Sequence, residues 1–392
     1  MNVAVFTDND FDKVNGVTTT LTAALQFAPP DVRMRVYTAA GIGEESPHYL
    51  ALRSLGVPIP FYAEMRMYVP RLRRYLAHAR ADRVDLVHLT TPGPIGLAGL
   101  WVAERLGVPL VGSFHTDLAA YTHLLSGSPR LGALMREYMR WPYGRCAQVL
   151  APSDATRRLL EGARGEGARV RVWPRGVDAD LFAPARRSER LRERWHVSPA
   201  RPALLYVGRV SREKGLDLLP LIQQALHSAR LEHRFIVVGQ GPLLPELQRR
   251  MPDAVFTGVL SRPAVAEAFA SADLFVFPSR TDTAGNVVLE AQASGLPVVV
   301  SGDGGPCENM RDGETGVVCR GEGSEAWADA VGRLVADRLR RRRMGVAARA
   351  YAESRRWQEA LQPLYRTYRE LVAVRGHAVA SASLEVAPGG RT

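Results

Sequence analysis

One stretch decides the fold of this chain: residues 274–301, which read LFVFPSRTDTAGNVVLEAQASGLPVVVS. Its two ends, Leu274–Phe277 and Val298–Val300, are short apolar runs typical of buried parallel strands. Between them the pattern predicts a helix over residues 286–294, closed by Gly295. The stretch therefore predicts a strand, a polar loop, a helix and a second parallel strand, which is the repeating unit of an α/β fold.

The polar loop inside this stretch carries its chemistry. The free N–H groups and the positive dipole end of a helix that begins at Asn286 and Val287 favour an anion such as phosphate. Gly285 would let a ligand approach the backbone closely. Asp282 and Glu290 flank that position, and because two carboxylates repel a phosphate, we expect them to accept hydrogen bonds from a sugar and a ribose. The loop predicts half of a nucleotide-sugar site; the alternative is a plain βαβ unit with a solvent-exposed acid.

A second unit of the same kind begins with the apolar strand at residues 203–207. The loop after it, GRVSREKG at residues 208–215, opens with Gly208 and contains Arg209 and Lys214 before a helix predicted from about residue 216. Arg209 offers a planar fork of donors and Lys214 a compact charge, so together they can clamp a diphosphate. The alternative for both cations is a solvated surface position.

The N-terminal half repeats the rhythm with a strand at residues 2–7, a polar loop and a helix from Gly16. The loop lacks GxGxxG, so a dinucleotide site is poorly supported. Asn15 and Gly16 could still present N–H groups to a phosphate, or they could simply form a turn. Both interpretations stay open at this point.

A later strand, residues 108–114, ends at His115 and Asp117. Polar groups there lie at the carboxyl edge of the sheet, where open α/β folds bind ligands. His115 is therefore a candidate catalytic residue, and its alternative is a structural histidine with its hydrogen bonds satisfied. Asp117 could orient His115 or accept a proton from the acceptor.

Composition limits the remaining possibilities. A chain of 392 residues fits two domains of roughly 150 to 200 residues each. The net charge of +11 favours anionic partners: nucleotide phosphates, nucleic acid or an anionic membrane surface. The three cysteines show no CxxC spacing, so we expect neither a disulfide framework nor a zinc site, and a reducing cytoplasm fits. Neither a signal peptide nor a membrane-spanning run is evident, so any membrane contact is expected to be peripheral.

Four further segments have readable patterns. Residues 64–83 predict a basic amphipathic helix that could lie on an anionic bilayer or pack on a sheet. Residues 183–202, with three prolines and many charges, predict an inter-domain connection. The arginine run 340–343 predicts a solvated helix face. Residues 357–374 predict a terminal helix, followed by a small, polar tail that we expect to be disordered.

In PSRTDTAGNVVLEAQASGLPVV an acidic residue is followed, after seven intervening residues, by a Glu. This pattern, together with GRVSREKG, resembles the signature of glycosyltransferase family 4, a large family of retaining GT-B enzymes. Asp282 stands where that family usually has Glu, and Ala284 where it usually has an aromatic residue. The resemblance implies two Rossmann-like domains facing across a cleft, with a C-terminal helix that crosses back to the first. The predicted divisions are 1–180 for the acceptor domain, 200–355 for the donor domain, 356–374 for the crossover helix and 375–392 for the tail.

The resemblance also implies residue roles. His115 would lie where acceptor and donor sugar meet, and Arg209, Lys214 and Asp282 would act on the reacting groups with it. The resemblance and the loop chemistry together give the donor-binding set Gly16, Gly208, Arg209, Lys214, Gly239, Asp282, Gly285, Asn286, Val287 and Glu290. Asn15 and Asp117 would lie on the acceptor side.

We expect transfer of a hexose, mannose from GDP-mannose, to a lipid, lipid-linked or glycan acceptor, with no metal and no cofactor beyond the nucleotide sugar. A UDP-hexose donor is the near alternative. A phosphorylase would need a buried lysine for pyridoxal phosphate, but the chain has only Lys13 and Lys214, both in polar loops. A basic nucleic-acid-binding protein is the alternative of another class. We expect a cytoplasmic monomer or weak dimer, at the inner face of the membrane, without specific nucleic-acid binding.

Overall fold

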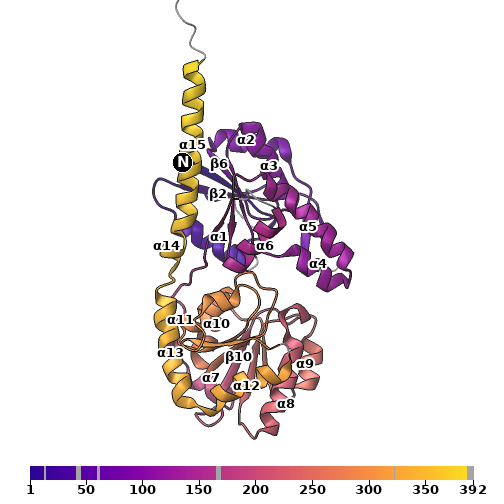
Figure 1. Cartoon of the computed structure of the whole chain (residues 1–392), viewed down its shortest axis with the longest axis vertical. Helices are drawn as coiled ribbons and strands as arrows, with labels where there is room; N and C mark the ends of the chain where they lie inside the picture. The colour runs from indigo at the N-terminus through magenta and orange to yellow at the C-terminus, as the bar shows by residue number, and fades with distance from the viewer. Residues whose placement is uncertain (13–14, 41–45, 60–61, 165–168, 322, 386–392) are drawn as a thin grey trace, which may run out of the picture. The chain divides into compact units, whose positions relative to one another are not determined.

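A computed structural model of the chain describes residues 1–12, 15–40, 46–59, 62–164, 169–321 and 323–385. Lys13 and the last residues of the predicted tail, 386–392, lie outside the described residues. The chain divides into two compact units. Unit 1 comprises residues 1–152, 157–174 and 361–392, and unit 2 comprises residues 153–156 and 175–360. Each unit is built on a parallel sheet with helices on its faces (Figure 1).

Unit 1 contains a seven-stranded sheet in the order β3-β2-β1-β6-β7-β8-β9. Its strands are β1 (Asn2–Phe6), β2 (Arg33–Thr38), β3 (Tyr49–Ala51), β6 (Leu86–Leu89), β7 (Leu110–Ser113), β8 (Gln148–Ala151) and β9 (Val170–Val172). Its helices are α1 (Gly16–Gln26), α2 (Leu72–Ala81), α3 (Pro94–Leu106), α4 (Leu118–Ser126), α5 (Pro129–Gly144) and α15 (Gln362–Glu385), and α6 (Asp154–Arg164) begins in unit 2 and continues into unit 1. All strand pairs of this sheet are parallel, and β6, β7 and β8 are buried throughout, as their apolar runs predict.

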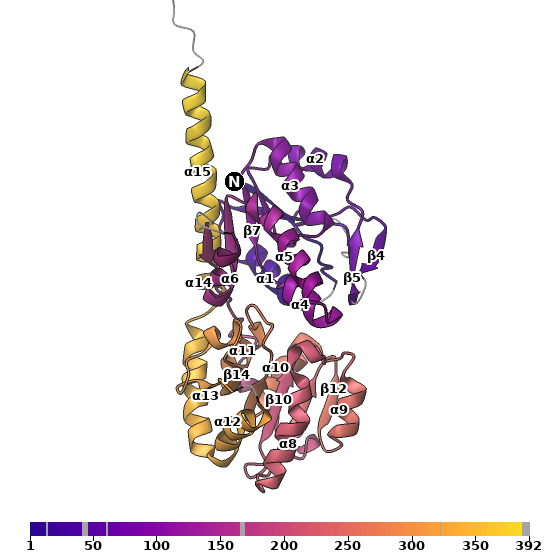
Figure 2. The same ribbon diagram turned by 45° about the vertical axis from the view of Figure 1, so that its right-hand side comes forward.

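The predicted basic helix over residues 64–83 is only partly correct. The chain first forms an antiparallel hairpin of β4 (Gly56–Ile59) and β5 (Tyr62–Tyr68), and helix α2 begins only at Leu72 (Figure 2). Pro70 explains the late start, because a residue that precedes proline is disfavoured in the α conformation. Tyr75 and Ala79 of α2 are fully buried, so this apolar face packs inside unit 1.

Unit 2 contains a six-stranded parallel sheet in the order β12-β11-β10-β13-β14-β15. Its strands are β10 (Ala203–Val207), β11 (Arg234–Val238), β12 (Val255–Gly258), β13 (Leu274–Phe277), β14 (Val298–Ser301) and β15 (Gly316–Cys319). Its helices are α7 (Glu189–Arg194), α8 (Leu219–Ser228), α9 (Leu244–Arg250), α10 (Arg262–Ser271), α11 (Asn286–Ala293), α12 (Ser324–Ala336), α13 (Arg338–Glu353) and α14 (Trp357–Ala360).

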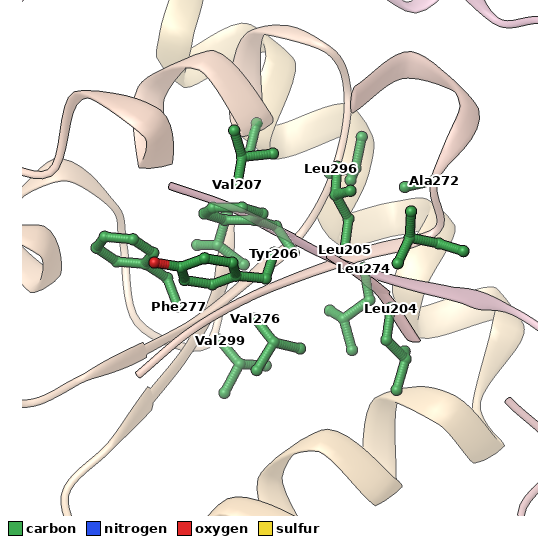
Figure 3. Close-up of a cluster of buried hydrophobic side chains, with 14 of the residues drawn as sticks. Leu204, Leu205, Tyr206, Val207, Ala272, Leu274, Val276, Phe277, Leu296 and Val299 are labelled. Carbon is green, nitrogen blue, oxygen red and sulfur yellow. The ribbon is translucent and has the colours of Figure 1, made fainter. Parts of the chain in front are cut away.

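The core of unit 2 is centred on β10 and β13. All five residues of β10 are buried, and the ring of Tyr206 stacks on Phe277 with centroids 5.9 Å apart (Figure 3). Leu204 and Val276 are fully buried in the same cluster. Burial of this apolar surface fixes the two strands whose carboxyl ends carry the predicted nucleotide loops.

The predicted inter-domain connection at residues 183–202 is wrong. Pro184–Arg186 form a 3₁₀ turn and α7 follows, capped by Ser188. Arg192 is 3 % exposed, pairs with Asp273 at 2.9 Å and donates to the carbonyl of Ser271. The segment therefore belongs to unit 2, and one of its arginines, Arg192, forms a buried ion pair.

Asp337 separates α12 from α13, and its side chain accepts a hydrogen bond from the Arg340 backbone N–H and caps α13. Arg341 is buried and donates to the last carbonyls of α12, including that of Val335 at 2.6 Å. The prediction that the whole run 340–343 is a solvated face is therefore wrong for Arg341. A guanidinium can satisfy the unpaired carbonyls at a helix end, which is why one arginine of the run is internal.

Helix α15 returns to unit 1. The Tyr365 hydroxyl donates to the carbonyl of Ala24 in α1 at 2.8 Å, and Arg369 pairs with Asp31 at 2.8 Å. The helix extends to Glu385, past the predicted end at residue 374 (Figure 1). No helix in the described part of the chain is long and apolar enough to cross a membrane.

Candidate functional site

The switch point of the unit 2 sheet lies between β10 and β13, where connections leave in opposite directions and open α/β sheets bind ligands. The loops that follow these strands, residues 208–215 and 278–285, pack on each other. Gly215 has φ 70°, and a Cβ there would lie 2.7 Å from the carbonyl oxygen of Pro278. Thr281 Oγ1 also donates to the carbonyl of Glu213 at 2.9 Å. The two predicted nucleotide loops therefore form one surface.

Lys214 and Asp282 meet on this surface. The Lys214 Nζ atom lies 2.7 Å from Asp282 Oδ1, and the two side chains are 15 % and 21 % exposed. The second carboxylate oxygen, Asp282 Oδ2, is buried and accepts no hydrogen bond within the described residues. A buried carboxylate oxygen without a donor is costly, so this atom fits a hydroxyl supplied by a ligand.

Arg209 lies in the same loop, and its guanidinium is close to the buried acid Glu213. Its Nε atom is 3.8 Å from Glu213 Oε1, and Glu213 is buried and accepts a hydrogen bond from Ser211 at 2.5 Å. The Arg209 side chain is 23 % exposed. Arg212, by contrast, is 72 % exposed and pairs with Glu246 at 3.1 Å. The structure thus separates the predicted clamp residue Arg209 from an ordinary surface arginine in the same loop.

Helix α11 begins at this surface with Gly285 as its N-cap. Gly285 has φ 69°, a conformation that favours glycine, and it has no side chain to cap the helix. Asn286 and Val287 follow and are half-buried. A hydrogen bond from a distant residue stabilises the loop: the Asn309 side-chain amide donates to the carbonyl of Ala284 at 2.5 Å. The backbone N–H groups of this first turn are therefore held in place at the switch point.

Glu290 lies one turn further along α11. The pKa of its carboxyl is raised to about 7, chiefly by burial; Arg262 acts to lower this pKa, and Asp178 adds to the increase. Arg262 Nη1 lies 3.9 Å from Glu290 Oε1. A carboxylate that is desolvated and only loosely paired is suited to accept hydrogen bonds from a ligand diol.

Gly208 and Gly239, both predicted to bind the donor, contact each other through the backbone. Gly208 N donates to the carbonyl of Val238 at 3.0 Å. Gly239 has φ 133°, and a Cβ there would lie 1.9 Å from the Gly208 carbonyl oxygen. Close approach of the two backbones, rather than space for a ligand, is sufficient to require glycine at residue 239.

In unit 1, Asn15 and Gly16 form the start of α1. Asn15 Oδ1 accepts hydrogen bonds from Val17 N at 2.9 Å and from Thr18 N at 3.0 Å, and Thr18 Oγ1 accepts from Asn15 N. This reciprocal arrangement is a capping box. N–H groups near the predicted phosphate position are therefore used by the protein itself in this structure.

His115 and Asp117 follow β7, as predicted, and their side chains make separate contacts. His115 Nε2 is 2.8 Å from Ser113 Oγ. Asp117 Oδ1 accepts a hydrogen bond from Ala120 N at 2.9 Å and caps α4. Ser113 was not singled out by the sequence, because a serine near the end of an apolar strand has no distinguishing pattern.

Asp8 is a further residue that the sequence analysis missed. It follows β1 and accepts hydrogen bonds from Ile95 N at 2.8 Å, Gly96 N at 3.2 Å and Thr91 Oγ1 at 2.7 Å. Burial raises the pKa of its carboxyl above the ordinary value. Asp8 therefore occupies the N-terminus of α3, at the switch point between β1 and β6. An acid just after the first strand was the available signal.

Across the described ranges, no three His, Cys, Asp or Glu side chains are grouped so that they could hold a metal ion. The ionic groups at the unit 2 switch point are instead the pairs given above.

Comparisons with known proteins place this geometry in a family. The profile described as "Glycosyltransferase Family 4" matches residues 14–181, and "Glycosyl transferases group 1" matches residues 201–337. A GDP-mannose-dependent alpha-mannosyltransferase of Mycobacterium tuberculosis is 34 % identical over 98 % of this chain and 99 % of its own length. Sulfoquinovosyl transferase SQD2 of Arabidopsis thaliana is 33 % identical over 83 % of this chain and 64 % of its own length.

The fold agrees with these relatives. Sucrose-phosphate synthase from Thermosynechococcus elongatus superimposes with a TM-score of 0.77 over 95 % of this chain and 99 % of that one, at 19 % identity. That likeness confirms the predicted pair of Rossmann-like units of the GT-B fold. Because the sequence identity to the mannosyltransferase extends over nearly the whole length of both proteins, the chain belongs to the family 4 glycosyltransferases and is a glycosyltransferase.

Proposed function

We propose that this glycosyltransferase retains the anomeric configuration and moves mannose from GDP-mannose to a lipid or lipid-linked acceptor without a metal ion. The observation that carries the donor site is the contact of Lys214 with Asp282 beside the glycine-capped start of α11. It brings a cation, a hydroxyl acceptor and a helix N-terminus to one switch point. A nucleoside diphosphate sugar needs these three kinds of group together.

The residues divide the work of the reaction by their chemistry. As the bond from the anomeric carbon to the diphosphate breaks, the electron pair goes to the diphosphate, and Arg209 and Lys214 stabilise that charge. Asp282 accepts a hydrogen bond from the sugar through its buried Oδ2, and Glu290 accepts from the ribose. The acceptor hydroxyl attacks from the face that the diphosphate leaves, which is what the family resemblance implies, and its proton passes to the departing diphosphate oxygen. The cations supply the charge that a metal would otherwise supply.

The donor assignment rests on relatives named for GDP-mannose, and a UDP-hexose is the second candidate. Thermal protection by GDP and by UDP, measured side by side, tests the choice. We expect GDP to protect at micromolar concentration and UDP to protect less. The Lys214→Ala variant is the control, because a protection that survives the loss of this cation would come from elsewhere. Protection by UDP alone would overturn the mannose assignment.

The acceptor side is proposed to meet an anionic membrane through the start of α2, not through its buried face. Arg71, Arg73 and Arg74 are exposed there. Val69 is 57 % exposed and Leu72 is 36 % exposed beside them. Each basic residue near an anionic surface contributes about 1 kcal/mol of attraction. This arrangement would hold the enzyme at the cytoplasmic face of the membrane as a peripheral protein.

Sedimentation with anionic vesicles at low salt tests the membrane proposal. Replacing Arg71, Arg73 and Arg74 with glutamate should abolish sedimentation. The matched control replaces three exposed arginines of α13, Arg338, Arg342 and Arg343, where Leu339 is also exposed. Equal loss in both triple variants would mean that only net charge matters, and no binding by the unaltered protein would remove the membrane proposal.

A further inference from the structure

Unit 1 contains an apolar pocket beside the end of β7. The pocket has a volume of about 80 Å³ and lies between α4, α5 and α6. Helices α4 and α5 lie side by side (Figures 1 and 2) and pack closely, since a Cβ at Gly132 would be 2.9 Å from the Cβ of His123. The floor of the pocket consists of five buried residues: Phe114, Ala119, Met139, Tyr143 and Leu160. A hydrocarbon group that enters this space leaves water, which is favourable.

Helix α5 forms one wall of the pocket through the spacing of its residues. Positions 136, 139, 140 and 143 follow the i, i+3, i+4, i+7 pattern that places side chains on one face of a helix. Met139 and Tyr143 are buried in the floor, whereas Arg136 and Arg140 also line the pocket but are exposed. This face of α5 therefore places two cations at the edge of an apolar space.

The charged residues at the edge of the pocket favour an anion. Besides the two arginines, one acid, Asp117, lines the pocket, and its Oδ1 already accepts the hydrogen bond from Ala120 N that caps α4. Arg140 pairs with Glu137, but both side chains are exposed, and exposed ion pairs are weak. Arg136 makes no ion pair within the ranges that the structure describes. The edge is therefore suited to a phosphate attached to an apolar chain.

The pocket is next to the candidate catalytic histidine. Two lining residues lie on either side of His115 in the chain: Phe114 precedes it, and Asp117 follows two residues later. The Tyr143 hydroxyl donates to the backbone carbonyl of Ser113 at 3.2 Å, and its ring centroid is 5.7 Å from that of Phe114. The floor is thus attached to the strand end that carries His115, so a molecule bound in the pocket extends toward this histidine.

We propose that this pocket binds the first part of the apolar chain of an acceptor lipid that carries a phosphate, with the phosphate beside Arg136 and Arg140. The floor takes the chain, the two guanidinium groups donate hydrogen bonds to phosphate oxygens, and the acceptor hydroxyl lies toward His115. The inference rests on the proposed function, because that proposal includes a lipid acceptor. It adds where in unit 1 the lipid binds and which part of the lipid is recognised.

NMR of the methionine methyl groups tests binding directly, because Met139 lies in the floor and is 6 % exposed. The chain has nine methionines, and the Met139→Leu spectrum identifies the relevant signal. The probes are decyl phosphate, decyl glucoside and inorganic phosphate, each added to the full chain. We expect decyl phosphate to shift the Met139 signal, decyl glucoside to need an about tenfold higher concentration, and inorganic phosphate to leave the signal in place. An unmoved Met139 signal with decyl phosphate, or equal affinity for the two decyl compounds, overturns the proposal.

Two arginine variants test the phosphate contact. Arg136→Gln should weaken decyl phosphate binding about tenfold and leave decyl glucoside binding unchanged, because only the phosphate needs the charge. Arg130→Gln is the matched control, since Arg130 is exposed on the same helix but does not line the pocket. An equal loss of decyl phosphate affinity in both variants would mean that net charge alone attracts the probe, and the proposal fails.

Two alanine variants test the apolar space. Ala120→Leu adds a larger side chain to the pocket and keeps the backbone N–H that Asp117 caps, so it should weaken the binding of both decyl compounds at least about fivefold. Ala133→Leu makes the same change at an exposed position of α5 outside the pocket and should have no effect. Equal affinities in the two variants overturn the proposal. If Ala120→Leu does not fold, the Met139 signal and Arg136→Gln still decide the outcome.

Nucleotide binding separates this inference from the proposed function. Arg136→Gln and Ala120→Leu should keep the thermal protection by GDP, because the donor loops lie in unit 2. If decyl phosphate does not bind while the unaltered protein transfers sugar to lipids of a membrane extract, the pocket inference fails and the proposed function stands. If decyl phosphate binds as expected but no sugar reaches any lipid, the lipid acceptor of the proposed function fails, whereas the binding of a lipid phosphate in this pocket stands.

Discussion

Each unit has its own parallel sheet with a central switch point, but the N-termini of helices near the switch points are capped differently. In unit 1 the protein supplies its own acceptors: Asn15 caps α1, Asp8 accepts from the first turn of α3, and Asp117 caps α4. In unit 2 the switch-point helix α11 starts at Gly285, which has no side chain to offer. Both units have the helix dipoles that favour anions, and at the N-terminus of α11 in unit 2 the cap residue contributes no acceptor of its own.

The charged side chains at the switch points also differ between the two units. The switch point of unit 2 carries Lys214 and Arg209, whereas that of unit 1 carries the buried carboxylate of Asp8. A phosphate brought to the α3 end would meet this acid and an occupied set of N–H groups. The comparison leads us to expect nucleotide binding where the sequence leaves a helix N-terminus without a side-chain cap, and this can be tested residue by residue.

The largest expected effect concerns Glu290. Its pKa of about 7 in the folded protein lies above the ordinary 4.5, so the folded state binds this proton more tightly than the unfolded chain does. That contribution to stability is complete below the ordinary pKa and is lost as the pH rises through about 7, amounting to about 3 kcal/mol. Glu290→Gln should therefore be stabilised relative to the unaltered protein at high pH and not at low pH. Chemical denaturation of both proteins across this range measures the difference.

The clamp of unit 2 gives the next effect. Arg209→Ala and Lys214→Ala should each lower turnover at least about tenfold, because each removes a charge-assisted interaction worth about 1.5 to 3 kcal/mol from the leaving diphosphate. Arg212→Ala is the control within the same loop, since that side chain is exposed and pairs with Glu246. Steady-state kinetics and melting temperatures are measured together. Wild-type turnover in both clamp variants, or an equal loss in Arg212→Ala, would end the assignment.

Asp8 tests the unit 1 side of the comparison. Asp8→Ala leaves two backbone N–H groups and a threonine hydroxyl without their acceptor, so it should lower the free energy of unfolding by about 2 kcal/mol. Nucleoside diphosphate affinity should not change. The converse holds for Asp282→Asn in unit 2, which should impair turnover more than stability. If Asp8→Ala loses nucleotide affinity while remaining folded, the cap of α3 is part of the donor site.

The position of Glu290 also predicts an effect on nucleoside diphosphate affinity. Glu290→Gln should weaken nucleoside diphosphate binding about tenfold, more than Asp282→Asn does, because an amide replaces only one of two acceptor oxygens for a ribose diol. Calorimetry with the unaltered protein should show affinity rising with pH through about 7, as the ionised carboxylate becomes available. Unchanged affinity in Glu290→Gln would mean that this carboxylate faces something other than the ribose.

Asp117 is expected to give the smallest effect. Asp117→Ala removes the cap of α4 and should lower stability by about 1 kcal/mol. Asp117→Asn keeps an acceptor for the Ala120 N–H and should be nearly neutral in both stability and turnover. A large loss of kcat in Asp117→Asn, with the fold intact, would instead identify a proton acceptor in unit 1 and make the two units less different than they appear.

The sequence predicted the elements whose patterns are local. The strands around 203–207 and 274–301 are buried on both faces and bounded by turn residues, and helix α11 begins at the predicted residue. The hairpin before α2 was missed because the helical spacing of residues 72–79 was extended backwards across Pro70. Segment 183–202 looked like a linker because its arginines read as solvent-exposed, whereas Arg192 finds a buried acid that comes from a distant part of the chain.

The site residues also divide into those that a local pattern predicts and those whose contacts come from distant parts of the chain. Lys214 and Asp282 were singled out from separate loops, and the structure brings them within 2.7 Å. The hydrogen bond between Tyr368 and His88 joins residues 280 positions apart, and no local pattern predicts such a pair. A histidine inside an apolar strand was nevertheless a usable signal, because a buried imidazole must find partners somewhere.

The chain passes out of unit 1 at residue 174 and comes back at residue 361, where the helix containing Tyr365 and Tyr368 begins. Within unit 2 the two passages lie side by side, since Val177 N donates to the carbonyl of Arg355 at 2.9 Å. During synthesis, therefore, the whole of unit 2 leaves the ribosome before unit 1 has received its last helix. Unit 1 begins to be synthesised first but is completed last. Until α15 has been made, the part of its sheet near His88 lacks the contact with Tyr368. A chain truncated before α15 should accumulate with unit 2 folded and unit 1 sensitive to protease.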